Sequence, residues 1–339
     1  MFNKIGIVGS GGWGCALASL LSQNGTPVTI WSHTPAVAEE INKHHTNERY
    51  LKGVAIPSTV HATASLEDLR DSDLLVFVVP SKAIRSVANE FARFSPKPGM
   101  VVVSCTKGIE HDSGKLMSQV LEECLPAPRI AVLSGPNLAL EVAAHIPAAS
   151  VVGSSHPDLL APLQHVFSSK SFRAYTSDDI IGIQLGGALK NVYAIAAGVC
   201  DGFGMGDNAK AALVTRSLSE MTRLGIALGG RMETFFGLSG VGDLMVTCFS
   251  SKSRNRSFGE RVGRGESPPD IIASLNSVAE GVPTSLSAWQ CAERFGIDAP
   301  ITTEVYSVLH TGRPPKESVA GLLGRPPKPE NGLQAESRK

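Results

Sequence analysis

The segment that decides the fold lies at the N-terminus and reads Phe2-Asn3-Lys4-Ile5-Gly6-Ile7-Val8-Gly9-Ser10-Gly11-Gly12-Trp13-Gly14. Residues 5–8 predict a buried strand, and the small and apolar residues 15–21 predict a packed helix. Between them stands Gly9-x-Gly11-x-x-Gly14, a spacing found where a dinucleotide binds between a strand and a helix. There Gly9 permits the tight turn, Gly11 lets a pyrophosphate approach, and Gly14 lets the helix pack on the strand. A strand-to-helix turn without a ligand is the alternative, because glycine-rich turns occur in many loops.

Length and composition predict two domains and no charge-driven partner. The chain has 339 residues, of which 42% are hydrophobic, and its 31 basic residues balance 31 acidic ones. We expect no apolar stretch long enough to span a bilayer, and the N-terminus lacks the pattern of a secretory signal. The sequence therefore predicts a cytoplasmic protein that neither binds nucleic acid nor inserts into a membrane.

The cysteines predict neither disulfides nor a metal site. They lie far apart, without a CxxC spacing or a cluster with histidine, mostly in apolar surroundings. We expect reduced thiols in the core, at Cys15, Cys105, Cys124, Cys200, Cys248 and Cys291.

The first half of the chain alternates predicted strands and helices. The strands are expected at residues 4–8, 27–31, 74–79, 100–104, 129–133 and 149–153. Helices are expected at residues 36–43, 82–91 and 115–124. Continuous apolar runs such as Leu74-Leu75-Val76-Phe77-Val78-Val79 suit strands covered on both faces. The pattern predicts an α/β fold with a Rossmann-like, doubly wound parallel sheet.

The second half is predicted to be mostly α-helical. Beyond about residue 180 we expect helices joined by Gly/Pro loops, at residues 186–200, 208–228, 257–263, 268–276, 283–295 and 301–311. The predicted domains are a dinucleotide-binding domain at 1–180 and a helical substrate-binding domain at 181–323. A disordered tail, rich in proline and charge, is expected at 324–339. A homodimer is compatible with the sequence, which does not decide the oligomeric state.

The end of the second strand bears on the choice of cofactor. An acidic residue about 20 residues after the fingerprint usually holds the ribose 2′-hydroxyl of NAD. Here residues 29–34 read Thr-Ile-Trp-Ser-His-Thr, with no carboxylate. His33 could donate to a 2′-phosphate, or it could cap the loop. NADPH is therefore a better fit than NADH, although either form is compatible.

Two further strands end in turns that could meet a ligand. Lys107 follows the predicted strand 100–104, at the edge of an α/β sheet where ligands bind. It could contact the cofactor or an anionic substrate, or it could be a solvated surface lysine. The next strand ends in the tight polar turn Ser134-Gly135-Pro136-Asn137, whose backbone could approach a ligand.

Lys190 is unusual because it lies in a predicted helix of small and apolar residues. Burying a lysine cation is costly unless the lysine is paired or loses its proton. A lysine with a lowered pKa can donate or accept a proton near neutral pH. The alternative is a lysine at the edge of the helix whose amine reaches solvent.

Two polar segments follow in the helical half. Asp243 lies in a Gly-flanked turn among apolar residues, in Val241-Gly242-Asp243-Leu244-Met245. Residues 250–256 then join hydroxyls, amides and guanidinium groups before a predicted helix, a combination that suits a phosphate. An exposed basic loop that contacts RNA is the alternative, and no interleaved aromatic residues support it.

Together these segments resemble the bacterial type of NAD(P)-dependent glycerol-3-phosphate dehydrogenase. The resemblance extends from Lys4 to Gly321. The family's order and spacing recur in Gly9-Ser10-Gly11-Gly12-Trp13-Gly14, Lys107-Gly108-Ile109, Ser134-Gly135-Pro136-Asn137, Lys190-Asn191, Gly240-Val241-Gly242-Asp243-Leu244, Ser253-Arg254-Asn255 and Ala279-Glu280-Gly281. The chain departs from the family at Asn137, where Ser or Thr is usual, and at His33, where Arg is common.

The resemblance also implies roles for individual residues. Beside the fingerprint glycines Gly9, Gly11 and Gly14, it implies dinucleotide contacts for Gly12, Trp13, His33, Lys107, Ala139, Arg254, Val278 and Glu280. It implies substrate contacts for Lys107, Gly135, Asn137, Lys190, Asp243, Ser253, Arg254 and Asn255. Lys190 would be the catalytic acid and base.

The implied function is the reversible reduction of dihydroxyacetone phosphate to sn-glycerol 3-phosphate for phospholipid synthesis, with NADPH or NADH as cofactor. The catalytic cleft would lie between the two domains. A reductase of a small hydroxy acid with the same architecture is one alternative, but it gives Ser253-Arg254-Asn255 no task. A dinucleotide-binding module without catalysis is another, and Lys190 in an apolar helix argues against it.

Overall fold

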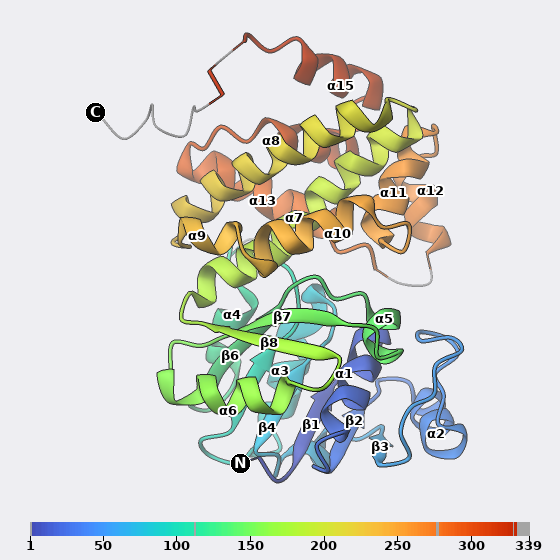
Figure 1. Cartoon of the computed structure of the whole chain (residues 1–339), viewed down its shortest axis with the longest axis vertical. Helices are drawn as coiled ribbons and strands as arrows, with labels where there is room; N and C mark the ends of the chain where they lie inside the picture. Colours follow the sequence, from blue (N-terminus) through green and yellow to red (C-terminus); the bar gives the residue numbers. More distant parts are fainter. Residues whose placement is uncertain (1, 112, 276–277, 328, 331–339) are drawn as a thin grey trace. The chain divides into compact units, whose positions relative to one another are not determined.

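Residues 5–8 form strand β1 (Ile5–Val8), an inner strand of an eight-stranded sheet (Figure 1). The computed structural model describes residues 2–111, 113–275, 278–327 and 329–330. Residue 276 of the predicted helix 268–276 lies outside the described residues. The same holds for residues 328 and 331–339 of the predicted tail.

The sheet confirms the predicted Rossmann-like architecture. Its order is β3-β2-β1-β4-β5-β6-β7-β8, and its strands pair in parallel except for β6 with β7. The other strands are β2 (Val28–Trp31), β3 (Val60–Thr63), β4 (Leu74–Phe77), β5 (Val101–Ser104), β6 (Arg129–Ser134), β7 (Ala148–Gly153) and β8 (Phe172–Ser177). The order reverses direction after β1, and the carboxyl ends of β1, β4 and β5 meet at one edge, where α/β folds bind ligands.

Helices cover both faces of this sheet. One core joins Ile5 and Ile7 to α1, α2, α5 and α6, and the other joins Val8 and Phe77 to α3 and α4. These helices are α1 (Gly12–Ser22), α2 (Pro35–His44), α3 (Ile84–Ala92), α4 (Met117–Cys124), α5 (Ala139–Ala143) and α6 (Pro157–Phe167), with short 3-10 helices at Leu66–Leu69 and Ser81–Ala83. Alternate residues of each strand thus supply two separate apolar layers.

Three features of the sheet differ from the sequence prediction. Strands β3 and β8 were not predicted, because neither is a continuous apolar run: exposed His61 interrupts β3, and buried residues alternate with exposed ones over the first four positions of β8. Helices α5 and α6 were also not predicted. Strand β7 runs antiparallel to β6, whereas the sequence predicted a parallel sheet.

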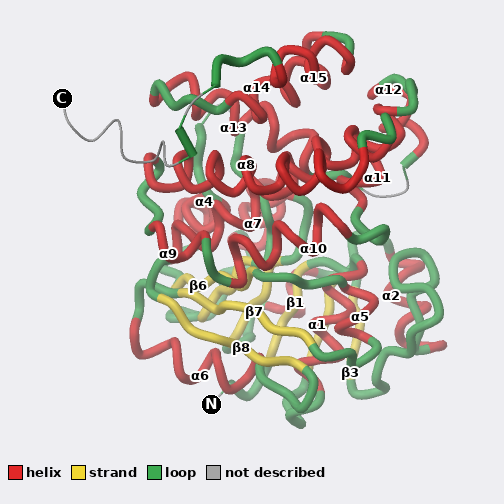
Figure 2. Tube along the Cα trace, turned by 45° about the horizontal axis from the view of Figure 1, so that its top comes forward, coloured by secondary structure: helices red, strands yellow, loops and turns green. Residues whose placement is uncertain are grey.

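The predicted helical half is confirmed. The described residues after β8 form helices and loops without a strand (Figure 2). The helices are α7 (Ile180–Gly202), α8 (Gly206–Ala227), α9 (Met232–Phe235), α10 (Asp243–Phe249), α11 (Arg254–Gly263), α12 (Pro268–Ser274), α13 (Gly281–Phe295), α14 (Pro300–Tyr306) and α15 (Pro315–Leu323). Short π-helical turns occur at Leu238–Gly242 and Ser307–Thr311. The sequence had not predicted α9, α10 or α15.

The chain divides into two compact units. Unit 1 comprises Met1–Glu110 with Lys115–Gln184, and unit 2 comprises His111–Gly114 with Leu185–Lys339. The domain bounds 1–180 and 181–323 stay a prediction from the sequence.

Helix α7 corrects one expectation from the sequence. It is long and apolar enough, by length and composition alone, to cross a membrane, and we had expected no such stretch. However, 83% of its apolar window is buried within the structure. A mostly buried helix of this kind is typical of a protein core, and the same helix carries Lys190.

The cysteines confirm the expected absence of disulfides. All six are free, five are buried, and Cys124 is half-buried. Burial raises the pKa of the Cys15 thiol to about 11 and that of Cys248 to about 12. These thiols therefore remain protonated at neutral pH, as expected of core residues.

Candidate active site

At two positions of the turn formed by the fingerprint glycines, no residue larger than glycine fits. A Cβ at Gly14 would lie 1.9 Å from the carbonyl oxygen of Gly9. Gly9 itself has a φ of 121°, and a Cβ there would lie 2.8 Å from the carbonyl oxygen of Val78. The two glycines thus bring α1 against β1, as the sequence predicted.

The same turn leaves the start of α1 suited to an anion. Gly11 is the N-cap of α1 and supplies no side-chain cap, and the first turn carries no acidic residue. A Cβ at Gly11 would meet no atom within 4 Å, so the backbone is open to close approach. Backbone amides at a helix N-terminus bind phosphate groups well. A dinucleotide pyrophosphate therefore fits this turn.

Neighbouring residues fix the turn from two sides. The buried side chain of Asn47 donates to the carbonyl oxygen of Ser10 over 2.8 Å. The Ser10 hydroxyl donates to the hydroxyl of Ser32 over 2.7 Å, which ties the turn to the end of β2. Sequence analysis missed Asn47, because an asparagine in a loop between α2 and β3 carries no signal of its partner.

The remaining predicted cofactor residues of unit 1 lie near this turn. Half-buried Trp13 packs against the core of the sheet. A Cβ at Gly12 would lie 2.6 Å from the carbonyl oxygen of Tyr50 and 3.7 Å from the Cβ of Ala139. His33 is exposed just beyond β2, which pairs with β1 in register through Trp31 and Val8.

Lys107 and the turn after β6 come together at the ends of neighbouring strands. The Lys107 amine donates to the carbonyl oxygen of Gly135 over 3.1 Å. The Asn137 amide donates to the Ser150 hydroxyl over 2.8 Å, while its own Oδ1 is buried without a hydrogen-bond partner. An unsatisfied buried acceptor is costly, so Asn137 Oδ1 is suited to accept from a ligand hydroxyl.

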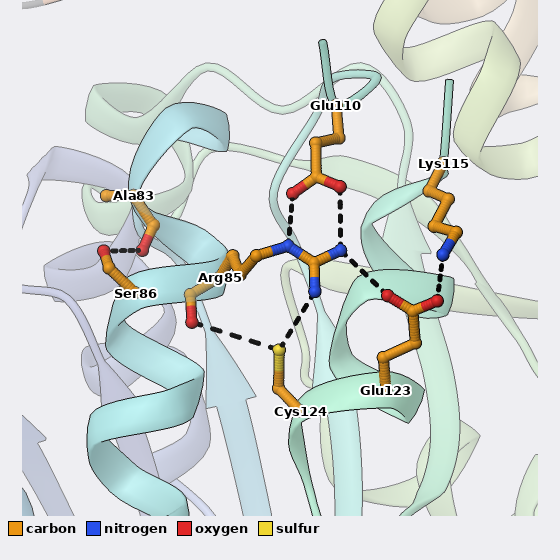
Figure 3. A network of polar contacts seen from close by, with 7 residues as sticks. All are labelled: Ala83, Arg85, Ser86, Glu110, Lys115, Glu123 and Cys124. Atoms are coloured by element: carbon orange, nitrogen blue, oxygen red, sulfur yellow. Dashed lines mark hydrogen bonds and ion pairs between the residues drawn. The ribbon is translucent and has the colours of Figure 1, made fainter. Parts of the chain in front are cut away.

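The segment that carries Lys107 is held in place by a network of ion pairs (Figure 3). Arg85 of α3 contacts both carboxylate oxygens of Glu110, at 2.7 and 2.8 Å, and reaches Glu123 at 2.9 Å. Glu123 also binds Lys115. A Cβ at Gly108 would lie 2.5 Å from the Cβ of Ser81, so only glycine fits there. Together these contacts fix the backbone that directly follows Lys107.

In unit 2, Lys190 is buried and paired. It is 7% exposed, and its amine donates to Asp243 Oδ1 over 2.5 Å and to the Thr247 hydroxyl over 2.6 Å. Asp243 is fully buried. The lysine therefore does not reach solvent from the edge of the helix, and a carboxylate favours its charged form.

Glycines explain how Asp243 comes beside Lys190. A Cβ at Gly186, one turn before Lys190, would lie 2.4 Å from the carbonyl oxygen of Ser239. The π-helical turn that precedes α10 can thus pack directly on α7. Asp243 is the first residue of α10, which corrects the prediction that it lies in a turn: Gly240 and Gly242 belong to the π-helical turn instead.

Thr247 was missed by the sequence analysis. It stands one helical turn after Asp243, and its hydroxyl also donates to the carbonyl oxygen of Asp243 over 2.6 Å. The i to i+4 spacing of an acid and a hydroxyl would have revealed it, had α10 been predicted.

The predicted phosphate-binding residues begin helix α11. Ser253 is its N-cap, and the serine hydroxyl accepts from the backbone amide of Arg256 over 3.2 Å. Arg254 is exposed at the first helical position. The helix thus begins three residues before the predicted range 257–263, and the arrangement presents amide and guanidinium donors to an anion.

Asn255 differs from its two neighbours because it bridges helices. Its side-chain amide donates to Asn191 Oδ1 over 2.9 Å, and its Oδ1 accepts from the backbone amide of Gly281 over 2.9 Å. Gly281 begins α13, directly after the half-buried Glu280. Asn255 thus joins α7 and α11 to the segment that holds Glu280 and the half-buried Val278.

The structure therefore sorts the predicted site residues into two sets. Unit 1 holds the fingerprint glycines with Trp13, His33, Lys107, Gly135, Asn137 and Ala139. Unit 2 holds Lys190, Asp243, Ser253, Arg254, Asn255, Val278 and Glu280. An apolar cavity of about 430 Å³ also lies in unit 2, among α7, α8, α14 and α15, and none of these predicted residues lines it.

Comparisons with known proteins agree along nearly the whole chain. Residues 4–160 match the family model of the NAD-dependent glycerol-3-phosphate dehydrogenase N-terminus, and residues 179–320 match that of its C-terminus. The chain is 47% identical over 325 residues to a glycerol-3-phosphate dehydrogenase [NAD(P)+] of Nitratidesulfovibrio vulgaris, covering 95% of this chain and 98% of the relative. It is 46% identical over 330 residues to that of Carboxydothermus hydrogenoformans, covering 96% and 98%.

A solved structure agrees as well. The crystal structure of glycerol-3-phosphate dehydrogenase from Coxiella burnetii is similar to this chain with a TM-score of 0.91 and 36% identity. The match covers 95% of this chain and 99% of that one.

Proposed function

Because the chain belongs to the family of NAD-dependent glycerol-3-phosphate dehydrogenases, we propose that Lys190 supplies the proton in the reaction of this family. The chain is an NAD(P)-dependent oxidoreductase that interconverts dihydroxyacetone phosphate and sn-glycerol 3-phosphate. The buried contact of 2.5 Å between Lys190 and Asp243 is the observation that carries the proposal.

Reduction of the ketone needs a hydride at its carbon and a proton at its oxygen. The nicotinamide supplies the hydride when the dinucleotide is bound. In our proposal the Lys190 ammonium donates a proton to the carbonyl oxygen, and in the reverse direction the neutral amine takes it back from the alcohol. Asp243 and Thr247 hold the Lys190 nitrogen in one position. The Asp243 carboxylate also favours return of the ammonium after each turnover.

The dinucleotide would be held by unit 1. We assign its pyrophosphate to the amides at the start of α1, beside Gly11, Gly12 and Trp13. His33 would meet the ribose or its 2′-phosphate, and we propose a preference for NADPH because no carboxylate stands at the end of β2. Ala139, Lys107, Arg254, Val278 and Glu280 are further proposed contacts to the dinucleotide.

The phosphate of the substrate would be bound at the start of α11. Ser253 and Arg254 offer a hydroxyl and a guanidinium beside the helix amides, and Asn255 Nδ2 carries a second hydrogen besides the one given to Asn191. On the unit 1 side we assign Lys107, the Gly135 backbone and Asn137 Oδ1 to the substrate. These roles all remain proposals.

An assay of substrates tests the proposed reaction. Oxidation of NADPH and of NADH would be followed with dihydroxyacetone phosphate, with unphosphorylated dihydroxyacetone and with a small 2-keto acid. We expect rapid oxidation with the phosphorylated ketone alone. A rate that is higher with the keto acid would support a hydroxy-acid reductase, and binding without turnover would support a module without catalysis.

Replacement of Arg254 tests the phosphate site. The Arg254→Ala variant should lose about 10- to 100-fold in kcat/KM for dihydroxyacetone phosphate, because charged hydrogen bonds contribute about 1.5–3 kcal/mol. Arg254→Lys should restore little, since lysine lacks the planar fork of arginine. Arg261→Ala, near the other end of α11, is the matched control and should behave like the wild type. Equal losses in both alanine variants would contradict this assignment.

We also propose a cytoplasmic homodimer that serves phospholipid synthesis. The free cysteines suit a reducing compartment. Exposed apolar side chains in unit 2, at Ile226, Met232 and Phe236, offer a surface for self-association. Light scattering after size-exclusion chromatography tests the dimer, and a monomeric mass at assay concentration would exclude it.

A further inference from the structure

One carboxylate in unit 2 holds two cations outside the residues assigned above. Asp201, in the last turn of α7, accepts from the Lys210 amine over 2.8 Å and forms an ion pair with Arg256 Nε at 2.6 Å. Lys210 is only 6% exposed, and the side chain of Arg256 is 16% exposed. These three residues form what we call the Asp201 network. No step of the proposed reaction uses them.

The network leads directly to the start of α11. Arg256 stands two residues after Arg254, and its backbone amide donates to the N-cap hydroxyl of Ser253. Its guanidinium also pairs with Glu260, one turn later, at 3.3 Å. Arg256 is therefore held by its backbone to the proposed phosphate site and by its side chain to α7.

Glycines bring α7 and α11 into direct backbone contact. A Cβ at Gly198 would lie 2.0 Å from the carbonyl oxygen of Arg256, and a Cβ at Gly259 would lie 2.0 Å from that of Ile195. Such contact fixes the distance between the two helices. However, glycines supply no side chain that restrains the rotation of α11 about its own axis. Two side-chain contacts to α7 supply that restraint: the hydrogen bond of Asn255 with Asn191 and the ion pair of Arg256 with Asp201.

The network also reaches α10, which carries Asp243 and Thr247. The Lys210 amine lies 4.8 Å from the centre of the Phe249 ring, at the end of that helix. A cation over an aromatic face is an attractive contact. Asp201 and Lys210 thus link α7 and α8 to α10, while Asp201 and Arg256 link α7 to α11.

We infer that Asp201 is a positioning residue for the substrate phosphate: through Arg256 it fixes the direction in which α11 presents Ser253 and Arg254. This inference rests on the proposed phosphate site. It predicts that losing either partner weakens binding of the phosphorylated substrate and leaves the dinucleotide site of unit 1 unchanged.

Asp201→Asn alone is a poor test, because Lys210 would remain buried without its carboxylate. The first informative variant is Asp201→Asn with Lys210→Met, which removes the carboxylate together with its buried cation. The second is Arg256→Met, which removes the other cation of the Asp201 network. The triple variant combines them. Arg256→Lys keeps the cation, and Glu304→Gln breaks an unrelated ion pair with Arg313 in the same unit, as a matched control.

We expect KM for dihydroxyacetone phosphate to rise roughly tenfold in both informative variants, within the usual range for coupled residues. The KM of the triple variant should be no higher than that of either informative variant, because both sets of substitutions remove the same restraint on α11. Arg256→Lys, which keeps the cation, should raise KM less than Arg256→Met does. The Kd for NADPH should change much less than this KM, because Arg254 is only one of several proposed dinucleotide contacts and most of them lie in unit 1. Glu304→Gln should keep the wild-type KM.

Three results would overturn the inference. The first is a wild-type KM in either informative variant with a Tm near that of the wild type. The second is a triple variant whose rise in KM equals the product of the rises in the two informative variants, which would mean that Asp201 and Arg256 act independently. The third is a raised KM in Arg256→Met with an unchanged KM in the variant that lacks Asp201 and Lys210, which would mean that Arg256 binds the phosphate itself. If the variant that lacks Asp201 and Lys210 does not fold, Arg256→Met is compared with Arg256→Lys instead. An equally raised KM in these two variants would show that the charge of Arg256 does not position α11.

Failure of the proposed reaction is a separate outcome. A wild type that does not oxidise NADPH with dihydroxyacetone phosphate would refute the proposed function, whereas an active wild type with unaffected variants refutes only the role of Asp201.

Discussion

Each unit presents one lysine to the proposed chemistry, and their surroundings differ. Lys107 is half-buried at the end of a strand, and its amine donates to the backbone carbonyl of Gly135 over 3.1 Å. Lys190 is 7% exposed within a helix, and a buried carboxylate and a hydroxyl hold its amine at 2.5 and 2.6 Å. A half-buried lysine that donates to a backbone carbonyl is suited to bind an anion. A buried lysine held by a carboxylate is suited to proton transfer. For these two lysines, the depth of burial and the charge of the partner thus agree with a binding role for Lys107 and a proton-transfer role for Lys190.

The largest effect is expected from Lys190→Ala. This variant should lose about 10²- to 10⁴-fold in kcat, the usual contribution of general acid–base catalysis. Asp243 would also lose its cation, at a cost of about 3–5 kcal/mol in the free energy of unfolding. The rates should therefore be measured well below the Tm of the variant, with NADPH binding as the control. A variant that keeps more than about a tenth of the wild-type kcat, far outside that range, would remove Lys190 from the chemistry.

A smaller and different effect is expected from Lys107→Ala. Its KM for dihydroxyacetone phosphate should rise about 10- to 100-fold, because a charged hydrogen bond contributes about 1.5–3 kcal/mol. Its Tm should change little, because the lysine is only half-buried and its amine donates to a backbone carbonyl oxygen, that of Gly135. Steady-state kinetics with a melting curve checks both points. If Lys107→Ala lost kcat as strongly as Lys190→Ala, the contrast between the two lysines would fail.

His33→Asp would sharpen the assignment of unit 1 to the dinucleotide. A carboxylate at the end of β2 should repel a 2′-phosphate and accept from a 2′-hydroxyl. We expect the ratio of Kd for NADPH to Kd for NADH to rise about tenfold, as for a like-charge contact near a protein surface. Fluorescence titrations with both cofactors measure this ratio. Parallel weakening of both would exclude His33 from the ribose site.

The smallest effect is expected from Arg85→Gln, which breaks the network that holds the Lys107 segment (Figure 3). The pKa of Arg85 is raised by Glu110 and then by Glu123, but the network is partly exposed. Exposed ion pairs contribute little, so KM should rise at most about fivefold. The difference from the wild type should shrink at high salt. A larger change that salt does not alter would mean that Arg85 has a buried role.

Much of the fold followed from local signals in the sequence. The glycines of 9–14 predicted the first turn, and continuous apolar runs predicted the inner strands such as β4. The helix predicted at 257–263 is α11, although it begins three residues earlier, at Arg254, with Ser253 as its N-cap. Edge strands β3 and β8 escaped prediction, since neither is a continuous apolar run.

The partners of the site residues could not be predicted in the same way. Lys190 and Asp243 are 53 residues apart, and their contact depends on Gly186 packing against the backbone of Ser239. The bond between Asn255 and Asn191 likewise depends on how α7 and α11 cross. Such pairs arise from tertiary packing, which no local pattern encodes, and the family resemblance supplied the residues but not their contacts.

The most direct test compares hydride transfer in Lys190→Ala and Lys107→Ala in a single turnover. Each variant would be saturated with NADPH and with dihydroxyacetone phosphate, and the loss of NADPH absorbance would be followed in a stopped-flow instrument. Saturation removes the difference in substrate binding, so the rate reports the chemical step. We predict that Lys107→Ala stays within about tenfold of the wild type, while Lys190→Ala falls by at least about 10²-fold. Equal rates in the two variants would contradict the assignment of binding to one lysine and proton transfer to the other.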